Sequence, residues 1–313
     1  MRAFAIDQFG DPGSVHDLPT PAPADGEILV RVRAAGLNGR DAGVAAGYMK
    51  DYMEHRFPLV PGSDASGLVE SVGSGVDGLA AGDEVIVDAR KPFVGAGTVA
   101  DFVVVRADAA VRKPATIDHA QAAALPLAGL AALAAVEALD PQSAETIVII
   151  GATGGVGSFA TQLIVGRGAR VIAVTRPEHA DYARSLGAID AIDYTTGDTL
   201  EQIRSRHGGD LGAILDFSGD KDLVNSLAVL LRSGGRVVST AGGADVEGLA
   251  QQGITGSAAN AGGADRLGEL IRLVADGTIR APKVTTFSLS DAAEALGQQA
   301  TRHVDGKLVI LLD

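Results

Sequence analysis

The sequence of 313 residues contains no cysteine and no tryptophan. Without cysteine the chain cannot form a disulfide, use a thiolate nucleophile or build a cysteine-ligated zinc or iron–sulfur site. The six histidines are scattered, and no two of them stand four residues apart, so the pattern of a metal-binding helix is missing. We therefore expect a protein without a metal site.

Basic residues are also fewer than acidic ones. There are 26 Lys and Arg against 39 Asp and Glu, which gives a formal net charge of −13. A surface of this sign repels nucleic-acid phosphates and anionic lipid head groups. We therefore expect neither a nucleic-acid nor a membrane partner.

Long hydrophobic runs are also missing. The stretch nearest to a membrane span, residues 120–136, is rich in alanine and interrupted by Pro126 and Gly129. It falls short of the ~20 strongly apolar residues that a span needs, and we interpret it as a buried helix with a kink or break near Pro126. The N-terminus lacks the basic segment and apolar core of a signal peptide, so we expect a cytoplasmic location.

The chain changes character near residue 115. Before it, apolar runs separated by Gly, Pro and Asp predict antiparallel strands at Ile28–Ala34, Ala65–Val72, Glu84–Asp88 and Ala100–Val105. After it, alternating strands and helices predict right-handed crossovers and a parallel sheet. The expected strands of this series are Thr146–Ile150, Arg170–Val174, Ala213–Phe217, Arg236–Thr240 and Lys283–Phe287, with helices at Ser158–Arg167 and Glu178–Leu186. The tail Lys307–Leu312 reads as one more apolar strand.

The most informative segment is Thr146–Ser158, TIVIIGATGGVGS, in which an apolar strand runs into a glycine-rich turn and then a helix. Glycines let the backbone approach a pyrophosphate, and the N–H groups at a helix start attract it. The usual first glycine of the G-x-G-x-x-G pattern is replaced by Ala152, with Gly151 just before it. Strand, turn, helix and second strand fall where a βαβ unit requires them. We predict a dinucleotide site in the turn formed by Thr153, Gly154, Gly155, Val156 and Gly157.

The end of the second strand indicates which dinucleotide is bound. Where an NAD site carries an acidic residue for the ribose 2′-hydroxyl, this chain has Thr175 and Arg176. An Arg guanidinium makes paired, charge-assisted hydrogen bonds to a phosphate, so we predict NADPH. The alternative is a surface arginine without a ligand. Tyr194, after the third strand of this unit, either flanks the adenine end or packs within the protein.

Further segments, taken in order, carry a family resemblance over nearly the whole chain. They are MRAFAIDQFGDPG with PAPADGEILVRVRAAGLNGRD, FPLVPGSDASGLVESVG (57–73), LPLAGLAA (125–132), GATGGVG (151–157), LDFSG (215–219), GGRVVSTAGG (234–243) and HVDGKLV (303–309). In these segments the chain resembles the zinc-independent quinone oxidoreductases of the medium-chain dehydrogenase/reductase superfamily.

The resemblance implies an α/β fold in which a Rossmann parallel-sheet cofactor domain is combined with a GroES-like β-rich catalytic domain. The GroES-like domain is expected at 1–117, completed by 282–313, and the Rossmann NADPH-binding domain at 118–281. A homodimer is implied too, commonly through Rossmann edge strands. Hydrophobic stretches near Arg236–Thr240 and Leu249–Ile254 are candidates for its interface.

The absence of cysteine excludes the usual zinc sites of the zinc-dependent members of this superfamily. The simplest metal-free reaction is hydride transfer from the nicotinamide to a quinone or an α,β-unsaturated carbonyl, with rate coming from positioning and from hydrogen bonds to the carbonyl oxygen. By similarity, Asn38 is the candidate donor to the nicotinamide region or the substrate carbonyl, unless it only bonds its own turn. Tyr48 is the candidate to bond a carbonyl or relay a proton, unless it simply packs.

Other candidates for the cofactor site stand at strand ends, where ligands of open α/β sheets bind; they are Phe217, Ser218, Ala241, Gly242 and, in a later loop, Ser257. Lys307 either reaches a phosphate or the ribose or faces solvent. Asp41 and Asp64 are expected to be structural hydrogen-bonding residues. Ala45 stands where the family often has Arg, and Ala131 where it has Thr, which removes two polar groups from the expected site.

The leading hypothesis is therefore an NADPH-dependent reductase of quinones or activated alkenes. An enoyl-thioester reductase acting on acyl carriers would share the fold and the cofactor. A non-catalytic NADPH-binding sensor is an alternative of another class. It stays open because alanine at positions 45 and 131 removes two polar groups from the expected site.

Overall fold

In the computed structural model, which describes residues 1–261 and 263–313, the chain divides into two compact units. Unit 1 is Met1–Leu127 with Gly263–Asp313, and unit 2 is Ala128–Gly262. The domain boundaries expected from the sequence are 117 and 281. Unit 1 reaches further at both places because helix α2 (His119–Ala123) packs on its strands β3 and β5 and helix α9 (Leu267–Ala275) contacts its strand β9.

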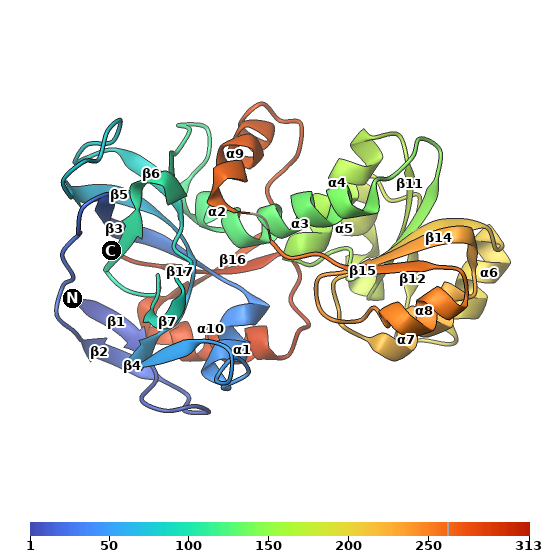
Figure 1. Cartoon of the computed structure of the whole chain (residues 1–313), viewed down its shortest axis with the longest axis horizontal. Helices are drawn as coiled ribbons and strands as arrows, with labels where there is room; N and C mark the ends of the chain where they lie inside the picture. Colours follow the sequence, from blue (N-terminus) through green and yellow to red (C-terminus); the bar gives the residue numbers. More distant parts are fainter. Residues whose placement is uncertain (262) are drawn as a thin grey trace. The chain divides into compact units, whose positions relative to one another are not determined.

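A seven-stranded sheet is the framework of unit 1 (Figure 1). Its order is β16-β17-β3-β5-β6-β9, with β8 also paired to β3. The bounds are β3 (Glu27–Leu37), β5 (Asp64–Val72), β6 (Glu84–Asp88), β8 (Phe102–Arg106), β9 (Ala110–Arg112), β16 (Val284–Ser288) and β17 (Lys307–Leu311). All pairs of this sheet except β16–β17 are antiparallel, which confirms the prediction for the strands expected near 28–34, 65–72, 84–88 and 100–105.

Smaller elements complete unit 1. Two short two-stranded sheets pair β1 (Arg2–Ala5) with β2 (Ser14–Asp17) and β4 (Glu54–Val60) with β7 (Phe93–Ala96). The remaining helical segments are α1 (Gly39–Ala45), α10 (Ala292–Ala300), η1 (Ala107–Ala109), η3 (Ala264–Arg266) and η4 (Leu289–Asp291). One core joins residues of β3, β5, β6, β8, α10 and β17, including Val30, Val87 and Ile310.

The C-terminal tail returns to the first strands of the chain, because β17 runs antiparallel to β3 with Leu308 opposite Leu37. Strand β16 pairs with β17, so counting Lys283–Phe287 among the strands of the parallel-sheet series is wrong. The reason lies in its composition. Its residues, VTTFS, are half-buried or exposed, whereas a parallel strand covered on both faces is apolar throughout.

Unit 2 is built on a six-stranded parallel sheet in the order β12-β11-β10-β13-β14-β15 (Figure 1). The strands are β10 (Thr146–Ile150), β11 (Arg170–Thr175), β12 (Asp190–Asp193), β13 (Leu211–Asp216), β14 (Leu231–Ser239) and β15 (Thr255–Ala258). The strand order reverses between β10 and β13, the switch point at which doubly wound folds bind ligands. This is the predicted Rossmann domain, and β15, a short run of small and polar residues, is the strand that the sequence pattern did not predict.

Helices precede the first of these strands and connect the others. They are α3 (Pro126–Leu139), α4 (Gly155–Gly166), α5 (Ala180–Ser185), α6 (Thr199–His207), α7 (Lys221–Ala228) and α8 (Val246–Gln251), with η2 (Pro177–His179) before α5. The break predicted near Pro126 is confirmed, because α2 ends at Ala123 and Pro126 is the first residue of α3, a position that suits its missing N–H. In the described part of the chain no helix is both long and apolar enough to cross a membrane.

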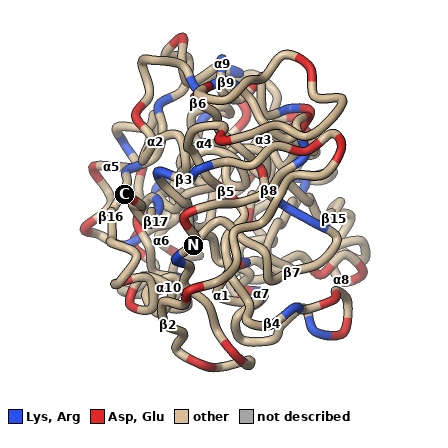
Figure 2. The backbone as a smooth tube through the Cα atoms, turned by 90° about the vertical axis from the view of Figure 1, so that its left-hand side faces the viewer, with Lys and Arg blue, Asp and Glu red and all other residues tan. Residues whose placement is uncertain are grey.

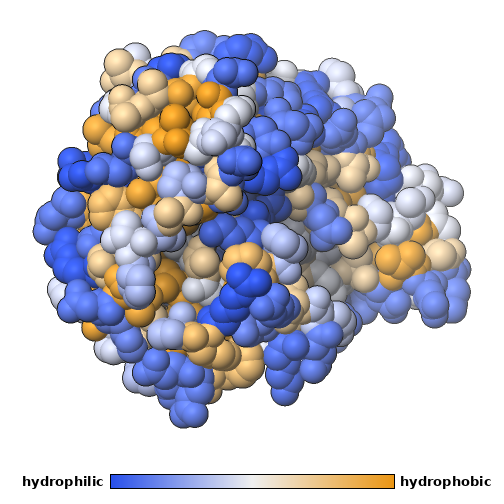
Figure 3. All heavy atoms as spheres, turned by 60° about the vertical axis from the view of Figure 1, so that its left-hand side comes forward, coloured by the Kyte–Doolittle hydropathy of each residue, from blue (hydrophilic) through white to orange (hydrophobic). Residues whose placement is uncertain are grey.

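The hydrophobic stretches considered for a dimer interface belong to the core of unit 2. Val237, Leu249 and Ile254 are buried in one cluster with the strands of the sheet. On the face shown in Figure 3, apolar side chains form separate small patches with hydrophilic side chains between them. Acidic and basic residues are interspersed along the backbone (Figure 2), so the acidic excess is spread over many segments.

Candidate functional site

The glycine-rich turn after β10 has the geometry of an anion site. Gly151 has a φ of +78°, a conformation that suits glycine. The first helical bond of α4 runs from the Ser158 N–H to the Gly154 carbonyl at 2.9 Å, so the three preceding N–H groups have no helical acceptor. Helix α4 has 12 residues, and its aligned dipoles add positive charge at this end. A pyrophosphate fits this combination.

Close packing explains why the turn needs its last glycine. A Cβ on Gly157 would lie 2.1 Å from the Gly151 carbonyl oxygen and 2.8 Å from backbone atoms of Ala152. Ala152 itself is fully buried, and Gly151 adopts the left-handed conformation one residue earlier. The departure from the G-x-G-x-x-G pattern is thus accommodated by a shift of one residue.

A hydrogen bond joins the turn to the second strand, β11, and the predicted phosphate-binding arginine follows that strand. The hydroxyls of Thr153 and Thr175 are 2.8 Å apart and buried. After β11, the Nε of Arg176 donates to the Tyr194 hydroxyl at 3.3 Å, while its NH1 lies 3.8 Å from a carboxylate oxygen of Glu178. The Arg176 side chain is 36% exposed, so it is available to a ligand. The structure therefore brings together Thr153, Thr175, Arg176 and Tyr194.

A buried carboxylate that sequence reasoning missed organises the two loops after β13 and β14. Asp216 accepts hydrogen bonds from the Ser218 N–H at 2.9 Å, the Ser218 hydroxyl at 2.8 Å and the Ser239 hydroxyl at 2.6 Å. The Ser239 hydroxyl in turn accepts from the Ala241 and Gly243 N–H groups. The predicted residues Phe217, Ser218, Ala241 and Gly242 lie in these loops. The prediction that Ser257 lies in a loop is wrong, because Ser257 pairs with Val238 as part of strand β15. The sequence signal that could have indicated Asp216 is an acidic residue at the end of an apolar strand.

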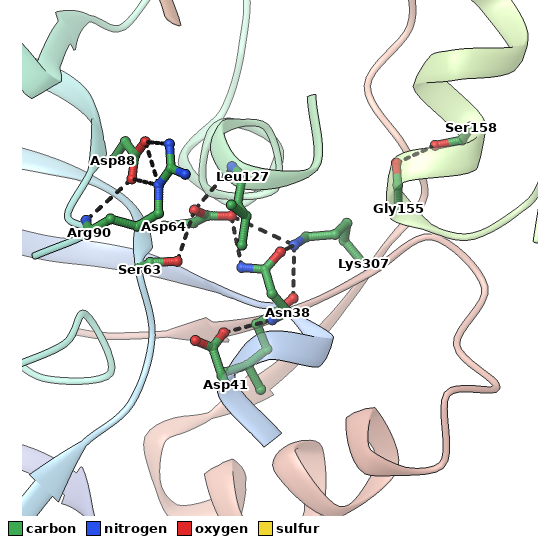
Figure 4. Close-up of polar contacts among 11 residues, drawn as sticks. Asn38, Asp41, Ser63, Asp64, Asp88, Arg90, Leu127, Gly155, Ser158 and Lys307 are labelled. Atoms are coloured by element: carbon green, nitrogen blue, oxygen red, sulfur yellow. Dashed lines mark hydrogen bonds and ion pairs between the residues drawn. The ribbon is translucent and has the colours of Figure 1, made fainter. Parts of the chain in front are cut away.

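In unit 1, Asn38 is held in a buried polar network (Figure 4). Its Nδ2 donates to Asp64 Oδ2 at 3.0 Å, and its Oδ1 accepts from the Lys307 ammonium at 2.5 Å. The same ammonium donates to the Leu37 carbonyl at 2.8 Å and lies 3.7 Å from Asp64. The Asn38 N–H donates to Asp41 Oδ2 at 2.8 Å, at the start of α1. The amide orientation of Asn38 is fixed from both ends.

Two alternatives left open by the sequence are wrong. Lys307 does not face solvent, because it is 4% exposed and its ammonium contacts only unit 1 residues in the described structure. Tyr48 is not a packing residue, because it is 77% exposed in the turn after α1. Asn38 bonds more than its own turn, since its amide reaches β5 and β17. Asp41 and Asp64 are hydrogen-bonded structural carboxylates, as expected.

Burial sets the protonation of this network. It raises the pKa of Asp64 to about 6, against the opposing effects of Lys307 and Asn38. Burial also raises the pKa of Asp41, and it lowers the pKa of Lys307, which Asp64 and Asp41 oppose. The carboxylate that orients Asn38 therefore titrates close to neutral pH.

This pKa predicts an acid limb in the activity. As the pH falls through about 6, Asp64 becomes neutral, loses its ion pair with Lys307 and holds the Asn38 amide less firmly. We expect kcat/KM for an uncharged acceptor to fall over this range. In Asp64→Asn, kcat/KM should be low throughout and should show no such fall. Because the folded-state pKa lies above the ordinary value of 3.8, ionisation of Asp64 lowers folding stability as the pH rises from about 4 to about 6. An unchanged limb in Asp64→Asn would assign it to another group.

Family models match both units of the chain. The model described as alcohol dehydrogenase GroES-like domain matches residues 24–115, and the model described as zinc-binding dehydrogenase matches residues 155–275. Among the described residues no group of three or more His, Cys, Asp or Glu is arranged to hold a metal ion.

Complete proteins show the same relationship. The mitochondrial NAD(P)H oxidoreductase RTN4IP1 of Mus musculus is 33% identical, over 91% of this chain and 81% of that protein. The chain belongs to the quinone oxidoreductase family of the medium-chain dehydrogenase/reductase superfamily. Two solved structures agree with this assignment. The quinone oxidoreductase of Coxiella burnetii has a TM-score of 0.90 at 29% identity, covering 100% of this chain and 99% of that one. The Escherichia coli quinone oxidoreductase complexed with NADPH has a TM-score of 0.86 at 25% identity, covering 100% of both chains.

This quinone oxidoreductase family member is an NAD(P)H-dependent oxidoreductase. The family resemblance read from the sequence, the α/β class and the combination of a Rossmann with a GroES-like domain are confirmed. One of the matching family models describes zinc-binding dehydrogenases, yet the chain has no cysteine to supply their usual ligands. In the Asn38 network, the positive charge beside the Asp64 carboxylate is the ammonium of Lys307, which also donates to the Asn38 amide oxygen.

Proposed function

We propose that this protein uses NADPH, without a metal, to reduce a quinone or an α,β-unsaturated carbonyl compound. In this proposal unit 2 binds the cofactor and unit 1 supplies the residues that act on the substrate. The observation that carries the choice of NADPH is Arg176, which follows β11 where NAD sites have an acidic residue. The Escherichia coli relative complexed with NADPH supports the same choice.

Each part of the cofactor has residues suited to hold it. The start of α4, with Gly154, Gly155, Val156 and Gly157, binds the pyrophosphate. Arg176 binds the ribose 2′-phosphate with its guanidinium, while Tyr194 keeps the arginine in place and borders the adenine end. The loops fixed by Asp216, with Ser218 and Ala241, border the nicotinamide end. When bound, NADPH supplies a hydride, that is, one hydrogen with two electrons.

Asn38 orients the acceptor. An amide nitrogen carries two N–H donors, and Asp64 accepts one of them, so the second is directed by the fixed amide and can donate to the substrate carbonyl oxygen. This hydrogen bond stabilises the negative charge that develops on the oxygen as the electrons arrive. A proton from water completes the reduction. We assign the relay of this proton to the hydroxyl of the exposed Tyr48 side chain. Lys307 is assigned to hold Asn38 rather than the cofactor.

Two further statements belong to the proposal. The protein forms a homodimer, and the edge strand β15 is its candidate interface because it has a sheet neighbour, β14, on one side. The protein acts in the cytoplasm on a small molecule. Size-exclusion chromatography with light scattering tests the dimer, and a monomer at micromolar concentration contradicts it.

The experiment that tests NADPH is the substitution Arg176→Ala. A charge-assisted hydrogen bond contributes about 1.5–3 kcal/mol, so kcat/KM for NADPH should fall about 10- to 100-fold. The value for NADH should stay the same, because NADH has no 2′-phosphate. Steady-state kinetics with both cofactors measures the ratio.

Glu178→Gln is the matched control for this test. It removes the carboxylate that lies 3.8 Å from the Arg176 guanidinium, so affinity for NADPH should rise rather than fall. A preference for NADPH over NADH that is unchanged in Arg176→Ala contradicts the assignment of Arg176.

A panel of acceptors separates the proposed activity from its alternatives. Oxidation of NADPH is followed by its absorbance at about 340 nm, with neutral quinones, enones and enoyl thioesters each supplied at the same concentration. Turnover of quinones or enones supports the proposal, and turnover of thioesters alone identifies an enoyl-thioester reductase. NADPH binding without turnover of any acceptor identifies a sensor.

A further inference from the structure

A pocket within unit 1 adjoins the Asn38 network. Two of its lining residues touch that network, since Asp41 accepts the Asn38 N–H at 2.8 Å and the Ser63 hydroxyl donates to Asp64 at 3.4 Å. Apolar walls come from Val44, Val60 and Phe93. A molecule in this pocket therefore lies beside the residues that hold the proposed substrate-binding amide.

Basic side chains dominate the charge of the pocket. Arg40, Arg90 and Lys91 line it, and the one acidic lining residue is Asp41. Arg90 is neutralised by Asp88, which it binds through two nitrogens at 2.5 and 2.8 Å. Arg40 and Lys91 have no such partner. No carboxylate lies within ion-pair distance of either one in the described part of the chain.

The contacts that these two cations do make are weak. The Arg40 guanidinium donates to the Met53 sulfur at 3.5 Å, and a thioether is a poor acceptor. The Lys91 ammonium donates to the Ala96 carbonyl at 3.2 Å and lies 5.7 Å from the centre of the Phe93 ring. Burial lowers the pKa of Lys91, so an anion beside its ammonium would stabilise the charged form. In a chain with 39 acidic residues, two unpaired cations at one pocket point to a ligand.

Charge complementarity indicates what kind of ligand fits. Arg40 and Lys91 are the basic lining residues without a carboxylate partner, because Arg90 pairs with Asp88. A carboxylate carries one negative charge, and its two oxygens match the planar fork of a guanidinium.

We propose that this pocket binds a carboxylate group of the substrate, so that the acceptor is an α,β-unsaturated carbonyl compound that is also a carboxylic acid. The inference rests on the proposed function and narrows its substrate class. Arg40 and Lys91 hold the carboxylate while the Asn38 amide donates to the ketone oxygen. The electron-poor double bond lies between the two groups, as it does in a 4-oxo-2-alkenoate.

A matched pair of substrates tests the proposal. The acid 4-oxopent-2-enoate and its methyl ester share the reactive enone and differ in charge. We expect kcat/KM to be about tenfold or more higher for the acid, the factor that corresponds to one retained ion pair. The double variant Arg40→Gln/Lys91→Met should bring the ratio of acid to ester to about one. Equal rates for acid and ester in the wild type, or a preference that survives in the double variant, would overturn the proposal.

Arg106→Gln is the matched control, because Arg106 is an exposed arginine of unit 1 that pairs with Asp108 away from the pocket lining. Its ratio of acid to ester should equal that of the wild type. Thermal unfolding of all variants checks that they fold.

Binding is measured separately with 4-oxopentanoate, the saturated acid, which has no double bond to reduce. Calorimetry should show that the double variant binds it about tenfold or more weaker than the wild type and Arg106→Gln do. Binding that is absent from the wild type, or equal in the double variant, overturns the pocket assignment. Binding that depends on Arg40 and Lys91 without turnover of acid or ester supports the pocket and contradicts the proposed function instead.

Discussion

Replacing Lys307 with methionine should lower the free energy of unfolding by about 3–5 kcal/mol, the loss expected when one partner of a buried ion pair is removed. Without the ammonium, the fully buried Asp64 carboxylate has no compensating charge, and the backbone carbonyl of Leu37 and the side-chain amide oxygen of Asn38 each lose a donor. Because the Asn38 amide is then free to turn, kcat should fall about 100-fold. Urea unfolding at about pH 8 and steady-state kinetics measure the two effects.

The pH dependence of this loss identifies its cause. In Lys307→Met the charged form of Asp64 loses its partner, so its pKa should rise above the value of about 6 in the wild type. In acid the carboxyl is neutral and needs no partner, so the loss of stability should be smaller at about pH 5 than at about pH 8. The double variant Lys307→Met/Asp64→Asn should recover part of it. A loss that is equal at both pH values means that Asp64 is not the group left uncompensated.

Replacing Gly157 with alanine should abolish most cofactor binding. The new Cβ would stand 2.1 Å from the Gly151 carbonyl oxygen, and the nearest atoms are all backbone, so the start of α4 must move away from the turn. Overpacking of this kind lowers stability by about 1–3 kcal/mol. Displacing the N–H groups that we propose bind the pyrophosphate should weaken NADPH binding about 100-fold, which calorimetry or fluorescence titration measures.

Gly166→Ala at the other end of α4 is the control. A Cβ there meets no heavy atom within 4 Å, and alanine is favoured over glycine in a helix, so stability should rise by about 0.5–1 kcal/mol with cofactor affinity unchanged. Full NADPH affinity in Gly157→Ala would show that the turn is not the pyrophosphate site.

Local signals allowed much of the Rossmann unit to be predicted. The strand at Thr146–Ile150 has the expected bounds, the turn and α4 follow it, and the break near Pro126 is where the proline requires it. Arg176 follows β11, whose apolar run is visible in the sequence, and Tyr194 follows β12, a short strand with aspartate at both ends. The binding roles of both residues stay predictions. Strand β15 and the position of β16 were missed because neither is a continuous apolar run, and register with a neighbour decides where such strands pair.

The absence of cysteine, the acidic charge, the glycine-rich turn before a helix and the arginine after the second strand were determined by the sequence alone, because they depend only on composition and on neighbouring residues. Only the tertiary structure decided what Lys307 does. Its ammonium meets Asn38 across 269 residues of chain, and this contact depends on β17 pairing with β3. The same holds for Asp216 and for the unpaired Arg40 and Lys91, since burial and the lack of a counter-ion are properties of side chains brought together by folding.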